Sequence, residues 1–252
     1  MRDDKGGSGR FTPPKGGLGG LPPRVIRRSV PDAVFLRVFS WRIFSWLAVG
    51  GTPTRGSPKP PPQERKTAAR LHARAARKAI PAGLRRAKEM RIREALRALP
   101  EMQRTKLVGS YVGVHSEVDT RVLIEELLMD RVRVAVPVIE SAETMRFAEI
   151  SSLGSLVHGA HHIPEPPAPH KLVPSVDVVI VPGLLFTLRC ERLGNGGGYF
   201  DRALQAMPHA LRVGLAYDEQ IVDELPIESH DEHMDVIVTD ERVLRAHPKR
   251  SS

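Results

Sequence analysis

The chain has 252 residues, 41% hydrophobic and 27% charged, a composition ordinary for a globular protein of one or two domains. Its single cysteine, Cys190, excludes an internal disulfide and fits a reducing compartment. The formal net charge is +9.

The charge is distributed unevenly along the chain. Residues 1–65 carry a net charge of +8 and residues 66–106 a net charge of +10, whereas residues 107–252 carry −9. A basic N-terminal part is therefore joined to an acidic body. Such a basic part is typical of proteins that contact nucleic acid or membrane phosphate, and it is equally compatible with the binding of nucleotide phosphates.

Residues 1–63 predict an extension that is separate from the domain after it. Glycine and proline are frequent in 6–23 and 50–62, and the apolar stretch 34–49 lies between them. Two arginines interrupt this stretch and it is shorter than a typical bilayer span, so we expect no transmembrane segment. A targeting or membrane-surface segment, a disordered extension and sequence upstream of a misplaced start codon are three interpretations. The Gly- and Pro-rich flanks favour the last two.

Two basic helices begin the predicted domain at 64–248. The pattern predicts helices over 64–80 and 84–99, ended by Pro81 and Pro100. Helices this rich in lysine and arginine usually present their charges on a solvated face.

Strands and helices alternate in the rest of the domain. Apolar runs predict strands at 107–114, 132–139, 144–150, 176–181, 212–217 and 235–239, the third being weaker and near an edge. Helices are expected over 121–130, capped by Asp119 or Thr120, and from 199 to about 207. This alternation predicts an α/β fold, with a mainly parallel sheet between two helical layers, preceded by the two basic helices and followed by a tail at 249–252.

The glycine-rich run at 192–201, Arg-Leu-Gly-Asn-Gly-Gly-Gly-Tyr-Phe-Asp, is the most informative segment. Glycine lets backbone N–H groups face a bulky anion, and the dipole of a following helix adds positive potential. Arg192 offers a forked donor for phosphate oxygens, and Asp201 offers a carboxylate for a metal. The run predicts a nucleotide-phosphate site, and for the glycines alone a plain turn is the alternative.

Five motifs, in the same order, resemble the 5-formyltetrahydrofolate cyclo-ligase family over about residues 66–244. They are Lys66-x-x-x-Arg70, Ser116-Glu117-Val118-Asp119-Thr120, Ile163-Pro164-Glu165-Pro166, Pro182-Gly183-Leu184-Leu185-Phe186 with the run 192–201, and Met234-Asp235-Val236-Ile237. The resemblance implies an ATP-dependent ligase that converts 5-formyltetrahydrofolate to 5,10-methenyltetrahydrofolate. It also implies transfer of the terminal phosphoryl group to the formyl oxygen, attack by a neighbouring folate nitrogen, and release of ADP and phosphate.

The resemblance also assigns expected roles, with ATP and Mg²⁺ as cofactors. ATP would be bound by Lys66, Arg70, Arg192, Leu193, Gly194, Asn195, Gly196, Gly197, Gly198, Tyr199 and Phe200. Tyr199 and Arg192 would act on the reacting groups, Val112 and Glu117 would contact the folate, and Asp201 and Asp235 would hold magnesium. Each role has an ordinary structural alternative: solvated cations for Lys66 and Arg70, a helix cap for Glu117, a turn residue for Asp235 and a core position for Tyr199.

The chain departs from the family pattern at three positions. Gly197 stands where some relatives carry lysine, so a phosphate contact is absent or comes from elsewhere, and Thr187 stands where aspartate is frequent. His161 precedes the Ile-Pro turn where some relatives carry an aromatic residue. The histidines of the loop 154–170 could bind a transition metal. A loop without a metal is favoured, because neither cysteines nor a second tight cluster accompanies them.

The expected partners are a folate and ATP, with nucleic acid less favoured because the basic excess lies outside the glycine run. We expect a cytoplasmic monomer or small homo-oligomer, with organelle targeting by the extension left open. Two other functions compete: an ATP-dependent enzyme acting on another pterin or carbonyl substrate, and a nucleic-acid binder that uses residues 1–106.

Overall fold

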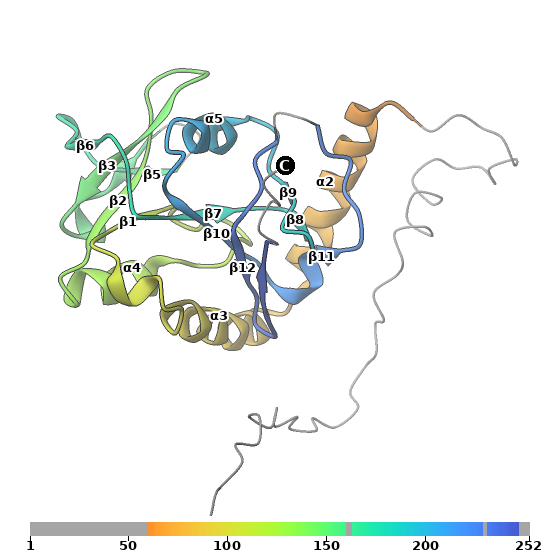
Figure 1. The fold of residues 1–252 in the computed structure, drawn as a ribbon, viewed down its shortest axis with the longest axis horizontal. Helices are drawn as coiled ribbons and strands as arrows, with labels where there is room; N and C mark the ends of the chain where they lie inside the picture. Colours follow the sequence, from red (N-terminus) through yellow and green to blue (C-terminus); the bar gives the residue numbers. More distant parts are fainter. Residues whose placement is uncertain (1–59, 160–162, 229–230, 247–252) are drawn as a thin grey trace, which may run out of the picture. The chain divides into compact units, whose positions relative to one another are not determined.

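The computed structural model describes residues 60–159, 163–228 and 231–246, and its centre is an eight-stranded mixed sheet (Figure 1). The strand order is β13-β12-β10-β7-β1-β2-β3-β6. The strands are β1 (Leu107–Ser110), β2 (Arg133–Ile139), β3 (Met145–Ile150), β6 (Leu172–Val173), β7 (Val178–Pro182), β10 (Leu211–Leu215), β12 (Val236–Val238) and β13 (Val243–Arg245). The five strands from β12 to β2 are parallel to one another. At the edges, β13 pairs antiparallel with β12, β3 pairs antiparallel with β2, and β6 pairs antiparallel with β3. The predicted mainly parallel sheet is confirmed.

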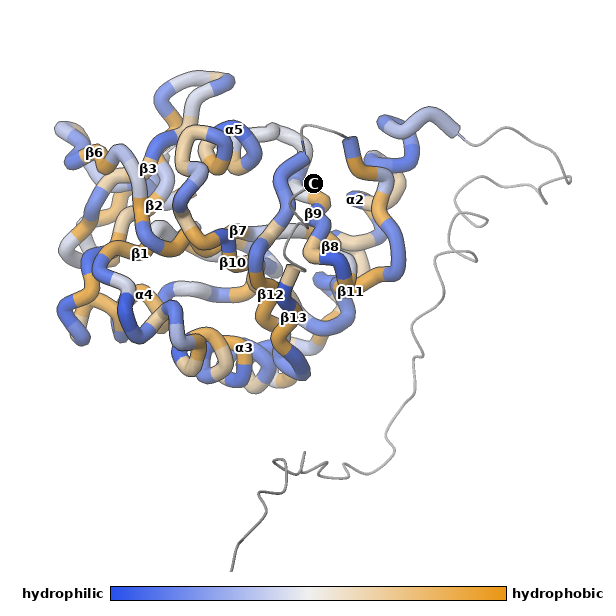
Figure 2. Tube along the Cα trace, in the orientation of Figure 1, coloured by the Kyte–Doolittle hydropathy of each residue, from blue (hydrophilic) through white to orange (hydrophobic). Residues whose placement is uncertain are grey.

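Helices cover both faces of this sheet. On one face, α3 (Ala82–Arg97) and α4 (Arg121–Met129) bury Leu96 and Ile124 against the strands. On the other face, α5 (Tyr199–Gln205) buries Leu204. Figure 1 shows α3 and α4 below the sheet and α5 above it, and Figure 2 shows apolar stretches along the central strands. Because both faces are covered, the interior of the sheet is mostly apolar: β7 and β12 carry no charged residue, as the sequence predicts.

The first strand is shorter than predicted because the chain leaves the sheet after Ser110. The buried Thr120 hydroxyl donates to the Tyr111 carbonyl at 2.5 Å and accepts from the Gly113 nitrogen at 3.2 Å, which holds 111–118 as a loop. Asp119 performs the capping role instead, since its Oδ1 accepts from the backbone nitrogen of Arg121 at 3.0 Å.

The sequence does not predict a second, three-stranded sheet in the order β11-β8-β9. These strands have only two or three residues each: β8 (Leu185–Thr187), β9 (Arg192–Leu193) and β11 (Ile221–Val222). The first helix, α2 (Pro62–Ala79), packs Ala69 and Ala73 into the same cluster as Leu184 and Leu193. This packing places a basic helix directly beside the start of the glycine run.

Short elements complete the described part of the chain. They are η1 (Met102–Arg104), η2 (Leu153–Ser155), η4 (Asp218–Gln220), and the pair β4 (Val157–His158) and β5 (Pro164–Glu165) inside the predicted loop. The predicted tail, most of the predicted extension and His161 lie outside the described residues. Within the described ranges, no helix has the length and apolarity needed to cross a membrane.

The strand order creates a crevice between β1 and β7. After β1 the chain moves to β2 on one side, whereas after β7 it moves to β10 and then β12 on the other. Connections that leave the carboxyl ends of two such strands diverge, and ligands of open α/β sheets bind between them. The loop 111–118 leaves β1 here, and the segment that carries the glycine run leaves β7.

Candidate active site

The glycine turn, residues 194–198, separates two cavities. The polar cavity has a volume of about 320 Å³ and is lined by Gln63, Lys66, Arg70, Leu193, Arg202, Gln205, Glu228 and Asp231. The apolar cavity has a volume of about 190 Å³ and is lined by Tyr111, Val112, Val114, Glu117, Pro137, Ile139, Met145, Ile163, Pro182, Asn195, Tyr199 and Phe200. Arg192, Gly194, Gly196, Gly197, Gly198 and Asp201 line both. A molecule in one cavity therefore reaches a molecule in the other across the turn.

Two positions of the turn require glycine for conformational reasons. Gly196 has φ of 106° and Gly198 has φ of 66°, both in the region that L side chains rarely adopt. A Cβ atom on Gly196 would also lie 3.2 Å from the guanidinium carbon of Arg70, and one on Gly198 would lie 2.6 Å from Nη1 of Arg202. The turn therefore brings its backbone close to two arginines.

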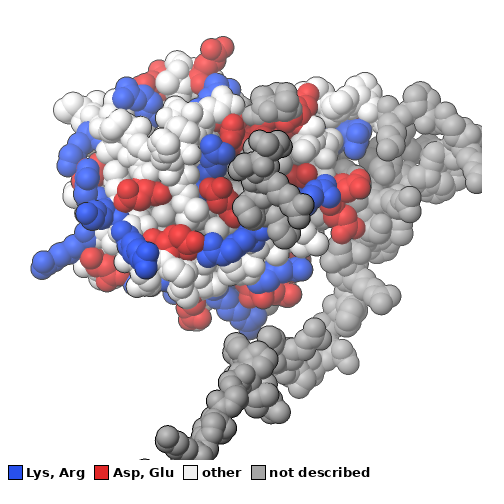
Figure 3. Space-filling model, viewed as in Figure 1, with Lys and Arg blue, Asp and Glu red and all other residues white. Residues whose placement is uncertain are grey.

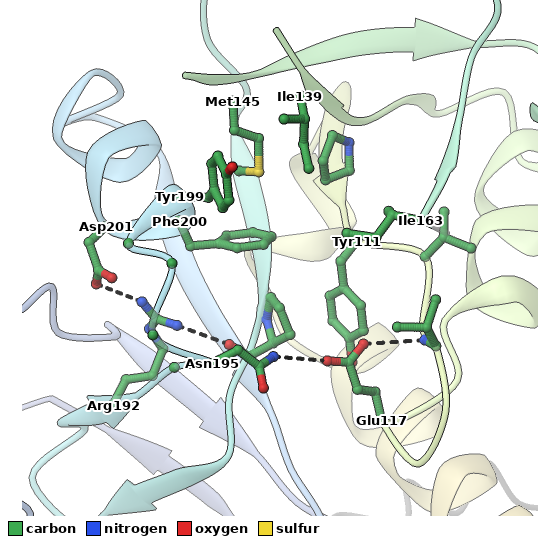
Figure 4. Close-up of a pocket in the computed structure, with 18 residues that line it drawn as sticks. Tyr111, Glu117, Ile139, Met145, Ile163, Arg192, Asn195, Tyr199, Phe200 and Asp201 are labelled. Carbon is green, nitrogen blue, oxygen red and sulfur yellow. Dashed lines mark hydrogen bonds and ion pairs between the residues drawn. The ribbon is translucent and has the colours of Figure 1, made fainter. Parts of the chain in front are cut away.

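Arg192 stabilises this turn through the contacts of its buried side chain. Its side chain is buried, Nη2 donates to Asp201 Oδ1 at 2.6 Å and Nη1 donates to the Pro182 carbonyl at 3.1 Å. The same Asp201 oxygen accepts from the backbone nitrogen of Glu232 at 3.3 Å. Arg192 and Asp201 thus form an ion pair at the boundary of the two cavities, as Figure 4 shows.

Lys66 also lines the polar cavity, and its side chain is 3% exposed. Its Nζ lies 2.6 Å from both Glu228 Oε2 and Asp231 Oδ2. Burial by itself lowers the pKa of Lys66, but the hydrogen bonds to Asp231 and Glu228 outweigh burial and raise the pKa above its ordinary value. Lys66 is therefore a buried, charged side chain with two carboxylate partners, which excludes the alternative of a merely solvated cation.

One face of α2 carries a row of basic residues toward the crevice. Arg70 Nε donates to the Gly194 carbonyl at 3.1 Å, and Arg74 Nη2 donates to the Asn195 carbonyl at 3.3 Å. One turn further on, the buried Arg77 follows. Sequence reasoning missed Arg74 and Arg77, although the spacing of four, four and three from Lys66 is the signal of one helical face.

The apolar cavity is lined mainly by aromatic and aliphatic side chains, and Glu117 is a carboxylate residue that lines this cavity alone. Tyr199 and Phe200 come from the first turn of α5, and Tyr111 and Val112 come from the loop that follows β1. Glu117 Oε1 lies 3.5 Å from Asn195 Nδ2, and its Oε2 accepts from the Val114 nitrogen at 3.2 Å (Figure 4). This arrangement suits a flat heterocycle that carries N–H donors.

Sequence reasoning also missed three walls of the apolar cavity. Tyr111 reaches it from the loop after β1, Ile139 from the end of β2 and Met145 from the start of β3. Apolar residues near the ends of buried strands resemble ordinary core residues, so the sequence holds no signal for them.

Two residues that the motifs single out are not brought into either cavity. Asp235 precedes β12, and its Oδ2 accepts from the backbone nitrogen of Arg212 at 2.8 Å. Thr187 is fully buried in the β8–β9 hairpin and donates to Glu191 Oε2 at 2.8 Å. Among the residues that the structure describes, no three His, Cys, Asp or Glu side chains are grouped to hold a metal by themselves.

The basic residues form no continuous surface on the face drawn in Figure 3, where lysines and arginines alternate with acidic residues. Lys88 on α3 is buried and paired with Asp240 at 2.6 Å. Lys66 and Arg77 are buried as well, so these three cations do not contribute to a solvated basic face on the two helices. On this face, the described residues therefore present no extended basic patch of the kind that binds nucleic acid.

Comparison with known proteins places this site in a family context. The model of the 5-formyltetrahydrofolate cyclo-ligase family matches residues 62–240. The chain is 34% identical over 151 residues to the 5-formyltetrahydrofolate cyclo-ligase of Escherichia coli K12, covering 57% of this chain and 83% of that protein. It is 28% identical over 216 residues to a mitochondrial 5-formyltetrahydrofolate cyclo-ligase of Arabidopsis thaliana, covering 74% and 78%. The structure of a 5,10-methenyltetrahydrofolate synthetase of Aquifex aeolicus superposes with a TM-score of 0.67 at 33% identity, covering 74% and 95%.

Proposed function

Because this chain belongs to the 5-formyltetrahydrofolate cyclo-ligase family, we propose that its two cavities hold the two substrates of that reaction. ATP places its phosphates in the polar cavity, and 5-formyltetrahydrofolate places its pterin in the apolar cavity. The observation that carries this assignment is the glycine turn, which lines both cavities and is the place where they meet.

The chemistry requires the two substrates to meet across that turn. A formyl carbon bonded to nitrogen is a poor electrophile, and its oxygen is a poor leaving group. Transfer of the terminal phosphoryl group forms a bond to the formyl oxygen and breaks the bond to ADP. The neighbouring folate nitrogen then attacks the carbon and loses its proton, and phosphate leaves with the former formyl oxygen. The products are 5,10-methenyltetrahydrofolate, ADP and phosphate.

The protein contributes position and charge to these steps. Lys66 and Arg70 contact the phosphates from α2, and the backbone N–H groups of the turn contact them from below. Arg192, held by Asp201, keeps the turn in place. On the other side, Tyr199 lies at the formyl group and Glu117 accepts hydrogen bonds from the pterin.

Asp201 is the residue that fits magnesium best. Its carboxylate lines both cavities, and Mg²⁺ in phosphate sites usually takes one or two carboxylates with the phosphates as further ligands. When bound, the ion neutralises charge on the phosphates. Asp235 as a second ligand stays a prediction, because the structure places it beside Arg212 and outside both cavities.

We also propose a cytoplasmic location, which the single free cysteine supports. Import into an organelle is the alternative, since the Arabidopsis relative is named mitochondrial. Fractionation of cells that express the full chain distinguishes the two.

The test of the proposed function is the growth of methenyl-folate absorbance from 5-formyltetrahydrofolate, with ATP and Mg²⁺ varied separately. Glu117→Gln should raise KM for the folate and leave KM for ATP unchanged. Asp201→Asn should raise the Mg²⁺ concentration that gives half activity. An unchanged Mg²⁺ dependence in Asp235→Asn would remove Asp235 from the site. No turnover by the folded wild-type protein would refute the proposed function.

A further inference from the structure

Two of the four basic side chains that line the polar cavity are matched by carboxylates. Lys66 contacts two of them and Arg192 contacts Asp201, with N–O distances of 2.6 Å in each pair. The other two, Arg70 and Arg202, form no ion pair with any residue in the described part of the chain. A bound anion would therefore gain most from these two charges, because no carboxylate among the described residues pairs with them.

Arg70 and Arg202 approach the glycine turn at two neighbouring points. The guanidinium carbon of Arg70 lies 3.2 Å from the position of a Cβ on Gly196. Nη2 of Arg202 donates to the Gly197 carbonyl at 3.0 Å, and its Nη1 lies 2.6 Å from the position of a Cβ on Gly198. Arg70 and Arg202, which have no carboxylate partner among the described residues, thus both contact the glycine turn.

Arg202 also contacts Tyr199, the residue that follows the glycine turn. Its guanidinium carbon lies 5.3 Å from the centre of the Tyr199 ring, a cation–π distance. Arg202 lines the polar cavity and Tyr199 lines the apolar one. Nε of Arg202 donates to the Glu143 carbonyl at 2.6 Å, which fixes the side chain at the junction of the cavities.

We propose that Arg202 is a catalytic residue that contacts the terminal phosphoryl group during its transfer, together with Arg70. This inference rests on the proposed function of the site. Charge on a transferring phosphoryl group spreads over its peripheral oxygens, and guanidinium groups stabilise that charge in other phosphoryl-transfer enzymes. Arg202 is placed for this role because it bridges the nucleotide side of the turn and the ring of Tyr199.

The experiment compares Arg202→Gln with Arg146→Gln. Arg146 lies on β3 outside both cavities, its side chain is 48% exposed, and it loses the same charge. We measure kcat/KM for ATP, and we measure binding of inorganic tripolyphosphate by calorimetry as a readout independent of turnover. Arg202→Gln should lower kcat/KM about 100-fold and weaken tripolyphosphate binding about tenfold, whereas Arg146→Gln should stay within about twofold of wild type on both measures.

Moving the positive charge from position 202 to position 197 distinguishes two roles of Arg202: contact with the phosphate, or only support of the glycine turn. Lysine in place of Gly197 carries a cation to the turn without the bond to the Glu143 carbonyl. A Cβ there would lie 3.0 Å from the Tyr199 ring, so a small shift of that ring accommodates it. Gly197→Lys in the Arg202→Gln background should recover about tenfold in kcat/KM for ATP, as expected for a restored charge.

Equal kcat/KM for ATP in Arg202→Gln and Arg146→Gln would overturn the inference, and so would a loss that lysine at 197 does not relieve. If Arg202→Gln fails to fold, Arg202→Lys decides, with Arg146→Lys as its control: a tenfold loss supports the contact and equal activity overturns it. Absence of turnover in the wild type would instead refute the proposed function, so the two failures are distinguishable.

Discussion

Arg77 joins the two sides of the crevice, and its removal should loosen the folate side more than the nucleotide side. The side chain is 7% exposed, Nε donates to Ser116 Oγ at 3.1 Å, and Nη1 donates to the Gly183 carbonyl at 3.3 Å. Ser116 belongs to the loop after β1, and Gly183 follows β7. Since Ser116 precedes Glu117, the anchor fixes the loop that carries the expected folate contact.

The magnitude follows from two opposing effects. Each hydrogen bond from a charged donor stabilises by about 1.5–3 kcal/mol. Burial disfavours the charge and lowers the pKa of Arg77, so removal of the guanidinium relieves part of that cost. We expect Arg77→Met to reduce the free energy of unfolding by about 2 kcal/mol, which lowers Tm by about 4–8 °C in a domain of this size.

Urea unfolding followed by circular dichroism measures this loss, and initial rates of methenyl-folate formation measure the site. Arg77→Met should raise KM for the folate about tenfold, from the displacement of Glu117, and raise KM for ATP less than about twofold. Lys78→Met, one position along α2 on its exposed side, is the matched control and should change stability by less than about 0.5 kcal/mol. Equal effects on the two KM values, or equal stability of the two variants, would refute the anchoring role.

Three other predictions concern the turn, the buried lysine and the thiol. Gly196→Ala should raise KM for ATP at least about tenfold, because a backbone φ of 106° costs an L residue about 1–3 kcal/mol. Gly83→Ala is the control and should leave KM for ATP unchanged, because an added Cβ at Gly83 meets nothing within 4 Å. Lys66→Met should reduce the free energy of unfolding by about 2 kcal/mol in urea titrations, because it removes the cation that two carboxylates contact at 2.6 Å; unchanged stability would contradict this account. Burial raises the pKa of Cys190 to about 11, so the folded thiol should resist alkylation at pH 8. Stability should also fall as pH rises from about 9 to 11, where the unfolded chain ionises this thiol first, and Cys190→Ala should lack that part of the slope.

Local sequence signals singled out Lys66, Arg70 and the glycine run, which the structure brings together at the polar cavity. The glycine run predicted a turn with unusual backbone angles, and Gly196 and Gly198 adopt them. The apolar runs predicted the central strands, because a parallel strand buried on both faces needs no polar alternation. Short strands such as β9 and β11 escaped prediction, since two residues carry no periodicity.

The sequence alone determined the α/β fold and the position of the glycine turn, because both depend on residues that are neighbours along the chain. Only the tertiary structure decided which cations remain unneutralised at the turn and which strands wall the apolar cavity. Arg202 and Arg192 are equally basic in the sequence, yet within the described ranges Arg192 pairs with Asp201 whereas Arg202 forms no ion pair. Such pairings depend on contacts between distant segments, and these contacts are fixed when the strands assemble in the order that opens the crevice between β1 and β7.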